Sequence, residues 1–405
     1  MPLGLNAIAC RNEENKREEE EMRAVAGSRF IRGGLFALVV LVLFAWQGIA
    51  SAELPVLPDV AKNPTEVGKP VNGRNVPTTI TVNLAAVEVL ANLTPDRVYK
   101  FWTFARADAQ GNPIAKPSVP GPMIRCMEGD TVVINLTSNI PNLEPHNIDL
   151  HAVMGPGGGA AVTAVMPDGQ TKTLTFKAMR EGAYIYHCAG EGMPWEHVAH
   201  GMYGLIMIEP RGGLPMVVDR KQVKEFYVGQ GEWYPTDAVV TDPEVSSGPF
   251  YDLDANKASA EHPDIYTFNG HQKALTDMDL FGHTMRVLPG DVVRIFFVNG
   301  GPNIGSNFHI IGQIFDRVVR GSRATPDLNE ETVYIAPGSA AVFEMTAAVP
   351  GQYLLVDHAL WRVPKGAGGN MFVLPPCADI MTPESWVCGG WPVNIYSPPA
   401  TGTGH

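Results

Sequence analysis

The sequence predicts an all-β protein that contains two copies of one β-domain, and three observations support this prediction. Of the 405 residues, 45% are hydrophobic and only 18% are charged, with 42 glycines and 34 prolines. This balance is typical of short strands separated by turns. Apolar and polar residues alternate in many short segments, and the pattern of residues 128–187 recurs in residues 289–358, a period of about 165 residues. Each copy holds about seven or eight short strands, which favours a Greek-key sandwich or a barrel.

Residues 1–52 are typical of a leader. Three arginines precede the apolar run of residues 35–46, and Ala50-Ser51-Ala52 offers a small-residue cleavage site. We therefore expect a Sec-type signal peptide that is cleaved between Ala52 and Glu53, and a periplasmic or otherwise exported protein. An uncleaved leader that anchors the chain in a membrane is the alternative.

The true start of the chain is also open. Residues 1–21 are acidic, which is unusual before a leader, so Met22 competes with Met1 as the first residue. Residues 1–52 contain six Lys or Arg and six Asp or Glu, so the formal charge of −12 belongs to the rest of the chain. An acidic exported domain argues against nucleic acid as a partner and suits a basic protein, although the charge also serves solubility alone.

After the leader, we expect an irregular lead-in over residues 53–77 and then a first β-domain over residues 78–212. A second β-domain covers residues 213–375, and an irregular tail covers residues 376–405. The segments that alternate or run apolar like strands are residues 78–84, 98–104, 131–136, 171–176, 182–187, 204–208, 292–298, 341–345 and 351–358.

Cysteines are few. Cys126 follows an apolar run and is expected to be a buried small hydrophobe. Cys377 and Cys388 lie eleven residues apart in the tail, where an oxidising compartment would let them form a disulfide. Whether they do so is left open.

The chemistry of the chain is concentrated in residues 187–202. Cys188 is followed by His197 and then by Met202. A Cys sulfur, two imidazoles and a weak axial Met form the ligand set of a blue-copper electron-transfer site. The second imidazole is supplied by His146, in the segment Pro145-His146-Asn147-Ile148-Asp149-Leu150-His151.

Strand alternation predicts a second site beside the first. His187 directly precedes Cys188, so the two side chains of an extended segment point to opposite faces. His146 and His151 differ by an odd number and separate in the same way, whereas Asp149 shares the face of His151. His151 and His187 therefore begin a second metal site with Asp149 beside them. A third histidine is needed, and His358 ends the equivalent strand of the second copy.

These motifs resemble those of the copper-containing nitrite reductases, and the resemblance covers residues 78–375. It rests on Pro145-His146-Asn147-x-Asp149-x-His151, on the spacing of His187, Cys188, His197 and Met202, on Phe308-His309-Ile310-Ile311-Gly312, on Glu331-Thr332 and on His358. The family implies two tandem cupredoxin-like Greek-key β-sandwich domains per subunit and a homotrimer.

The resemblance also implies a role for each residue. His146, Cys188, His197 and Met202 match the ligands of type 1 copper, and His151, His187 and His358 match those of the catalytic type 2 copper. The family places the type 2 copper between subunits, with the third histidine donated by a neighbour. Asp149 and His309 match the proton-relay pair, Ile311 a cap over the nitrite pocket, and Glu331 and Thr332 the residues that support the catalytic histidine.

The implied activity is the one-electron reduction of nitrite to nitric oxide and water. A small c-type cytochrome or a cupredoxin would deliver the electron, and Cys188 and His187 would carry it from the first copper to the second.

This chain departs from the family pattern near the type 1 ligands. Glu196 directly precedes His197, and the Pro194-Trp195 pair is shifted by one position. His200 lies between two ligands, where we expect a solvent-facing side chain rather than an alternative ligand. Three further histidines, His262, His271 and His283, join no cluster and are expected in loops or at the surface.

Two other functions compete with nitrite reduction. A multicopper oxidase would share the domains, but its trinuclear centre needs His-x-His pairs and a His-Cys-His run, whereas Ala189 follows Cys188. An electron carrier would keep the blue site alone and would have no use for Asp149, His151, His309 and His358.

Overall fold

The computed structural model describes residues 53–139 and 141–374. The predicted leader, the tail and the Cys377–Cys388 pair lie outside this part. The described chain consists mainly of strands, so the all-β prediction is confirmed. Its α-helices are short: α2 (Pro194–Ala199), α3 (Ala255–Ser259) and α4 (Met278–Phe281). None of the described helices has the length and apolar character needed to cross a membrane.

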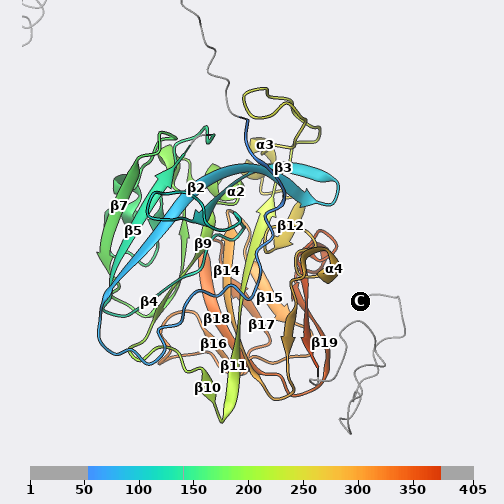
Figure 1. Cartoon of the computed structure of the whole chain (residues 1–405). Coiled ribbons are helices and arrows are strands. Elements are labelled where there is room, and N and C mark those ends of the chain that lie inside the picture. Colours follow the sequence, from blue (N-terminus) through green and yellow to red (C-terminus); the bar gives the residue numbers. More distant parts are fainter. Residues whose placement is uncertain (1–52, 140, 375–405) are drawn as a thin grey trace, which may run out of the picture. The chain divides into compact units, whose positions relative to one another are not determined.

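The first half of the described chain forms two sheets. One has the order β1-β2-β5-β7, with β3 also paired to β2, and the other has the order β4-β9-β8-β6. Their strands are β1 (Val56–Asp59), β2 (Thr79–Thr94), β3 (Arg97–Arg106), β4 (Ile124–Met127), β5 (Thr131–Ser138), β6 (Asp149–Leu150), β7 (Thr171–Lys177), β8 (Gly182–His187) and β9 (Tyr203–Glu209). Figure 1 shows the long blue β2 running from the green strands β5 and β7 towards β3 and β12.

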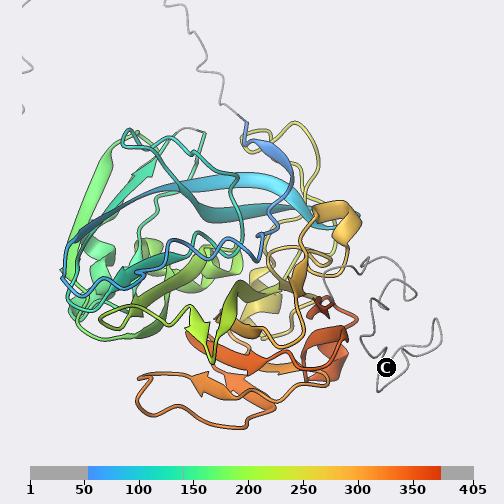
Figure 2. The same ribbon diagram turned by 60° about the horizontal axis from the view of Figure 1, so that its bottom comes forward.

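The second half repeats this arrangement. One sheet has the order β10-β11-β14-β18-β16 with β12 paired to β11, and the other has the order β13-β20-β19-β15-β17. Their strands are β10 (Val217–Val218), β11 (Lys221–Trp233), β12 (Ile265–Phe268), β13 (Met285–Val287), β14 (Val292–Gly301), β15 (Ser306–Ile310), β16 (Arg317–Val319), β17 (Thr332–Ile335), β18 (Ser339–Thr346), β19 (Gly351–Asp357) and β20 (Gly368–Val373). The orange and red strands of this half lie together in both views (Figures 1 and 2).

Two sheets meet at the junction of the halves, one with β8 and β9 and the other with β11 and β14. Both faces of these sheets are buried, which explains why their strands are apolar throughout. In β9, Ile206 and Ile208 face the core of the first half, whereas Leu205 and Met207 face the second half. In β14, Phe296 belongs to the same apolar layer between the halves as Leu205 and Met207. The adjacent Ile295 and Phe297 face the core of the second half. Burial of alternate side chains on opposite faces is what a strand between two apolar layers requires.

Buried ion pairs also cross this junction. Arg125 of β4 contacts Glu209 at 2.7 Å and Glu225 of β11 at 2.6 Å. Glu225 in turn contacts Arg294 of β14 at 2.8 Å. Because a buried charge is costly unless it is paired, these groups favour one relative placement of the two halves.

The structure refines the predicted elements. The segment predicted as an irregular lead-in contributes β1, which pairs in parallel with β2. The strand predicted from residue 78 to 84 continues to Thr94 as β2. The domain limits predicted at residues 212 and 375 stay predictions.

Candidate metal centres

The first cluster lies in the core of the first half. His146, Cys188 and His197 are buried, and one donor atom of each lies within 4.8 Å of the others. The Nδ1 atoms of His146 and His197 are 3.3 Å apart, and Cys188 Sγ is 3.9 Å from His146 Nδ1. The structure therefore brings together three of the four residues predicted to bind type 1 copper.

Met202, the fourth, is fully buried and belongs to the same core as Cys188. The peptide N–H of Cys188 donates to the Met202 carbonyl at 3.0 Å, so β9 begins directly beside the thiol. Asn147 orients the sulfur, because its N–H donates to Cys188 Sγ at 3.2 Å and its side-chain oxygen accepts from Ala189 N at 2.7 Å.

The spacing of these donors suits a small metal ion. Two nitrogens bound to one ion at about 2.0–2.1 Å in tetrahedral geometry lie about 3.3 Å apart, as the two imidazoles do. Burial lowers the pKa of His197 to about 3, with further contributions from His146 and His200. His197 is thus neutral, which is the form of imidazole that binds metals. A thiolate with two imidazoles binds copper in preference to hard cations such as magnesium or calcium.

The second cluster lies on the other side of the His187–Cys188 peptide bond. Asp149, His151 and His187 each offer a ligand atom within 4.8 Å of the others, and the two imidazole Nε2 atoms are 3.2 Å apart. Asp149 of β6 stands opposite His187 of β8 in the sheet, which places both at one edge. His187 Nδ1 donates to the Cys188 carbonyl at 3.0 Å, so its Nε2 is left free to bind a metal.

His151 and His187 are arranged as two ligands of one ion. Burial lowers the pKa of His151, and the nearby His187 imidazole lowers it further. Two imidazoles that face each other across 3.2 Å cannot both carry protons without repulsion, so this arrangement favours a bound cation.

The remaining predicted site residues form a separate group in the second half. His309 and His358 pack edge to face with ring centroids 5.1 Å apart. His309 Nδ1 donates to the Glu331 carbonyl at 2.6 Å and lies 3.2 Å from Thr332 Oγ1, which itself contacts the Glu331 carboxylate. The structure thus unites His309 with Glu331 and Thr332. Neither His309 nor His358 belongs to the group of Asp149, His151 and His187.

Ile311 follows β15 directly and is partly exposed. Its N–H donates to the Leu354 carbonyl, so the extended pairing with β19 continues through it. Ile311 begins the turn that is closed by the hydrogen bond from Gln313 N to the Ile310 carbonyl at 3.0 Å.

One expectation about the histidines was wrong. His200 was expected to face solvent, but it is buried. Its ring stacks on Trp102 at 4.0 Å, and its Nδ1 donates to the Lys100 carbonyl at 2.9 Å. His200 therefore gives structural support behind the predicted type 1 ligands. His271 lies in a loop, as expected, and is buried there.

Sequence reasoning missed two residues that touch the predicted type 1 ligands. Trp102 lies 4.8 Å from His197 and 5.6 Å from His146, measured between ring centroids. Glu88 Oε1 lies 3.1 Å from His146 Nε2. Both stand opposite each other on β2 and β3, and the alternation of these strands could have identified them as core-facing.

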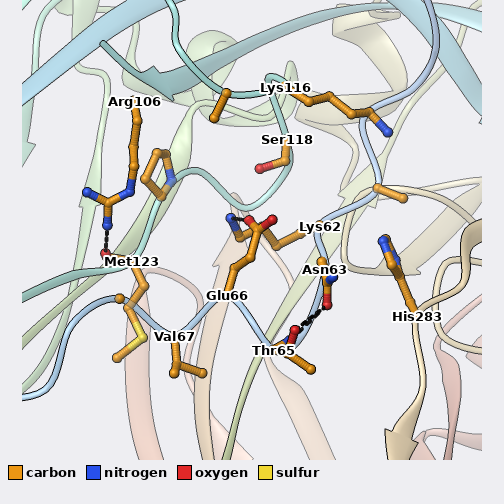
Figure 3. Close-up of a pocket in the computed structure, with 14 residues that line it drawn as sticks. Lys62, Asn63, Thr65, Glu66, Val67, Arg106, Lys116, Ser118, Met123 and His283 are labelled. Carbon is orange, nitrogen blue, oxygen red and sulfur yellow. Dashed lines mark hydrogen bonds and ion pairs between the residues drawn. The ribbon is translucent and has the colours of Figure 1, made fainter. Parts of the chain in front are cut away.

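A cavity of about 540 Å³ lies elsewhere, between the lead-in and residues 106–123 of the first half, with His283 as its one lining residue from the second half (Figure 3). Figure 3 shows Lys62 and Glu66 meeting inside it, with His283 on the opposite wall. None of the predicted ligands lines this cavity, so it is not part of either metal site.

Comparisons with known proteins match each half of the described chain separately and both halves together. Two family models described as multicopper oxidase match residues 102–213 and 224–370. A copper-containing nitrite reductase of Neisseria meningitidis serogroup B is 39% identical over 325 residues, which are 80% of this chain and 76% of that protein. A copper-containing nitrite reductase of Neisseria gonorrhoeae is 38% identical, with coverage of 79% and 75%.

Solved structures agree on the fold. The copper nitrite reductase of Nitrosomonas europaea superposes with a TM-score of 0.58 at 28% identity, over 74% of this chain and 95% of that one. A multicopper oxidase superposes with a TM-score of 0.58 at 22% identity, over 78% and 98%. The second likeness shows the shared fold alone.

Proposed function

The chain belongs to the family of copper-containing nitrite reductases, and from that premise we propose that it reduces nitrite by one electron to nitric oxide and water, with uptake of two protons. It is an oxidoreductase. The observation that carries the proposal is the pair of donor clusters that meet at adjacent residues: Cys188 faces the first and His187 faces the second.

The donor sets assign the metal. His146, Cys188, His197 and Met202 would hold type 1 copper, and His151, His187 and His358 would hold type 2 copper, two ions per subunit. Bound copper would supply one-electron chemistry at both sites and a positively charged contact for nitrite at the second.

The protein's own residues would connect the two clusters, carry protons and limit the pocket. Two connections join the clusters. One is the peptide bond between His187 and Cys188, and the other is the hydrogen bond from His187 Nδ1 to the Cys188 carbonyl. His309, which donates from Nδ1 to the Glu331 carbonyl, keeps Nε2 available to take up and release a proton. Asp149 lies beside His151 and His187, where it can hold a proton next to bound nitrite. Ile311, which is exposed two residues after His309, would limit the pocket.

A homotrimer completes the second site in this proposal. Within one chain, His358 lies with His309 and apart from His151 and His187, so each chain contains two half-sites. One half-site offers two imidazoles and a carboxylate, and the other offers two imidazoles. The catalytic site becomes complete when the two half-sites of neighbouring subunits meet in a closed ring.

The electron donor is proposed to dock over α2. This helix carries the buried His197 and the exposed Trp195, and Met193 just before it is also exposed. Aromatic side chains and methionines are enriched at protein interfaces. A small c-type cytochrome or a cupredoxin with a basic surface would fit the acidic chain, in a periplasmic or otherwise exported location.

Copper content together with gas release tests the function. Copper-loaded protein with an artificial one-electron donor, without oxygen, is expected to hold two copper ions per chain and to release nitric oxide from nitrite. One copper ion per chain without release would indicate an electron carrier. Four copper ions per chain with oxygen consumption would indicate a multicopper oxidase.

A further inference from the structure

Glu88 is a buried carboxylate in the core of the first half. In β2, Val82, Leu84 and Ala86 face this core, and the next residue in the same alternation is Glu88. The pairing of β2 with β5 ends at Ala86 and Ser138, just before this position. Glu88 therefore points into the space where the chain leaves β5 on its way to the type 1 site.

One oxygen of Glu88 accepts three hydrogen bonds. Oε1 accepts from Leu143 N at 2.8 Å and from Glu144 N at 2.7 Å, and it lies 3.1 Å from His146 Nε2. The Glu88 N–H donates to the side chain of Asn142 at 2.8 Å. The strand thus holds the loop that carries His146 at several points.

The orientation of His146 determines which atom donates to Glu88. Its Nδ1 faces Cys188 Sγ and His197 Nδ1, which makes Nδ1 the atom on the metal side. A neutral imidazole that binds a metal through Nδ1 carries its proton on Nε2. In the copper-bound protein, His146 Nε2 must donate, and Glu88 Oε1 is its acceptor.

A loop clamp alone does not account for a carboxylate here. Glu88 Oε2 is buried and has no hydrogen-bond partner, and within the described residues no Lys or Arg pairs with Glu88. Burial of a carboxylate is costly unless a positive charge compensates it. Without a metal, His146 itself supplies this charge: despite burial, which acts the other way, its contacts with Cys188 and Glu88 raise the pKa of His146 to about 9. Once copper binds Nδ1, the imidazole is neutral, and the compensating charge is that of the metal on the far side of the ring.

We propose that Glu88 is a positioning residue of the type 1 site, which fixes the His146 ring and lowers the reduction potential of the copper by making that imidazole a stronger donor. A carboxylate that accepts from the remote nitrogen of a ligating imidazole raises its basicity, and a more basic ligand stabilises Cu(II) over Cu(I). The proposal rests on the proposed function in that His146 binds type 1 copper.

The test is a redox titration of the blue absorption band in Glu88→Gln. This variant keeps the size and an acceptor oxygen but removes the charge. We expect blue protein in which the equilibrium constant for reduction by a mediator rises at least tenfold, equivalent to about 59 mV for one electron. An unchanged potential in copper-loaded Glu88→Gln would overturn the proposal.

Glu232→Gln is the matched control. Glu232 is also buried and accepts from two consecutive backbone amides, Asn303 N at 2.7 Å and Ile304 N at 2.9 Å, without touching a metal ligand. We expect its reduction equilibrium to change less than twofold. A shift as large as that of Glu88→Gln would show a general effect of lost charge and would contradict the proposal.

Glu88→Asp separates charge from clamping. Asp keeps the charge but is too short to hold the loop in the same way. If the charge of the carboxylate sets the reduction potential of the copper, that potential rises less in Glu88→Asp than in Glu88→Gln. If Glu88 only clamps the loop, the shorter Asp disturbs the site more than Gln does, and that order would refute the proposal. If Glu88→Gln yields no blue protein, Glu88→Asp decides alone: because the charge is kept, a change of less than tenfold in the reduction equilibrium supports the proposal, and a change of tenfold or more rejects it. Failure of the proposed function would appear earlier, as wild-type protein without a blue band.

Discussion

His309 and His358 pack edge to face with ring centroids 5.1 Å apart, on a sheet that is separate from the one that carries His151 and His187. In the proposed function, each chain therefore contributes two separate parts of the catalytic site. One half has two imidazoles and the Asp149 carboxylate, and the other has the third imidazole and the second proton carrier. Neither half can do the proposed chemistry alone.

Mixed trimers test whether the halves meet across a subunit boundary. His151→Ala and His358→Ala subunits are each expected to be inactive. When they are co-expressed in equal amounts, about a quarter of the interfaces join one intact half to the other in a randomly assembled ring. Nitrite turnover should therefore return to about a quarter of the wild-type value. If the site is completed within one chain, the mixture stays inactive.

The proton carriers can be removed without loss of metal. His309→Ala and Asp149→Ala are expected to keep both copper ions but to lose turnover by roughly 10²- to 10⁴-fold, the usual contribution of a positioned acid or base. Copper analysis and single-turnover rates check this. His262→Ala, at an exposed histidine outside both clusters, serves as the control. Wild-type rates in either of the first two variants would rule out the relay.

Gly190 leaves room for the His197 ring. A Cβ at this position would lie 2.5 Å from His197 Cε1 and 2.6 Å from Nε2, which no real Cβ contact permits. Gly190→Ala should therefore displace the imidazole and weaken type 1 copper binding by roughly 10- to 100-fold, the range for residues that orient a metal ligand. Copper titration of the blue band measures this. Gly155→Ala, where a Cβ meets nothing within 4 Å, should bind copper like the wild type.

His271 should make folding sensitive to acid. Burial lowers the pKa of His271 to about 4, whereas the unfolded chain keeps a value near 6.5. As pH falls from 6.5 to 4, the unfolded state binds a proton that the folded state does not, so stability is lost in this window, by up to about 3 kcal/mol. Urea titrations of His271→Gln at several pH values should show a shallower loss than those of the wild type. The matched change at exposed His262 should leave the loss as steep as before, and an equally steep loss in His271→Gln would contradict the assignment.

Strand alternation explains why much of the site was predictable. His187 and Cys188 separate to opposite faces because they end a regular strand, and this alone sorts the two clusters. The segment of His146 and His151 is extended only at Asp149–Leu150, yet His146 is buried and His151 is exposed, as the alternation predicts.

Other features depend on contacts that alternation does not reveal. His200 was expected at the surface because it follows a ligand in a short helix, but a stack on Trp102 buries it. Glu88 was missed because the predicted strand ended at residue 84, before the alternation reached the carboxylate. In the proposed trimer, His358 meets the other ligands across a subunit boundary, and no pattern within one chain can specify that contact.

The central claim is that nitrite is reduced at a second copper site which needs His358. The most direct measurement is nitric oxide release from nitrite, without oxygen, by copper-loaded wild-type protein and His358→Ala, with the blue band recorded for both. The account predicts release by the wild type and loss of release in His358→Ala while the blue band stays intact. Release at the wild-type rate from His358→Ala would contradict it.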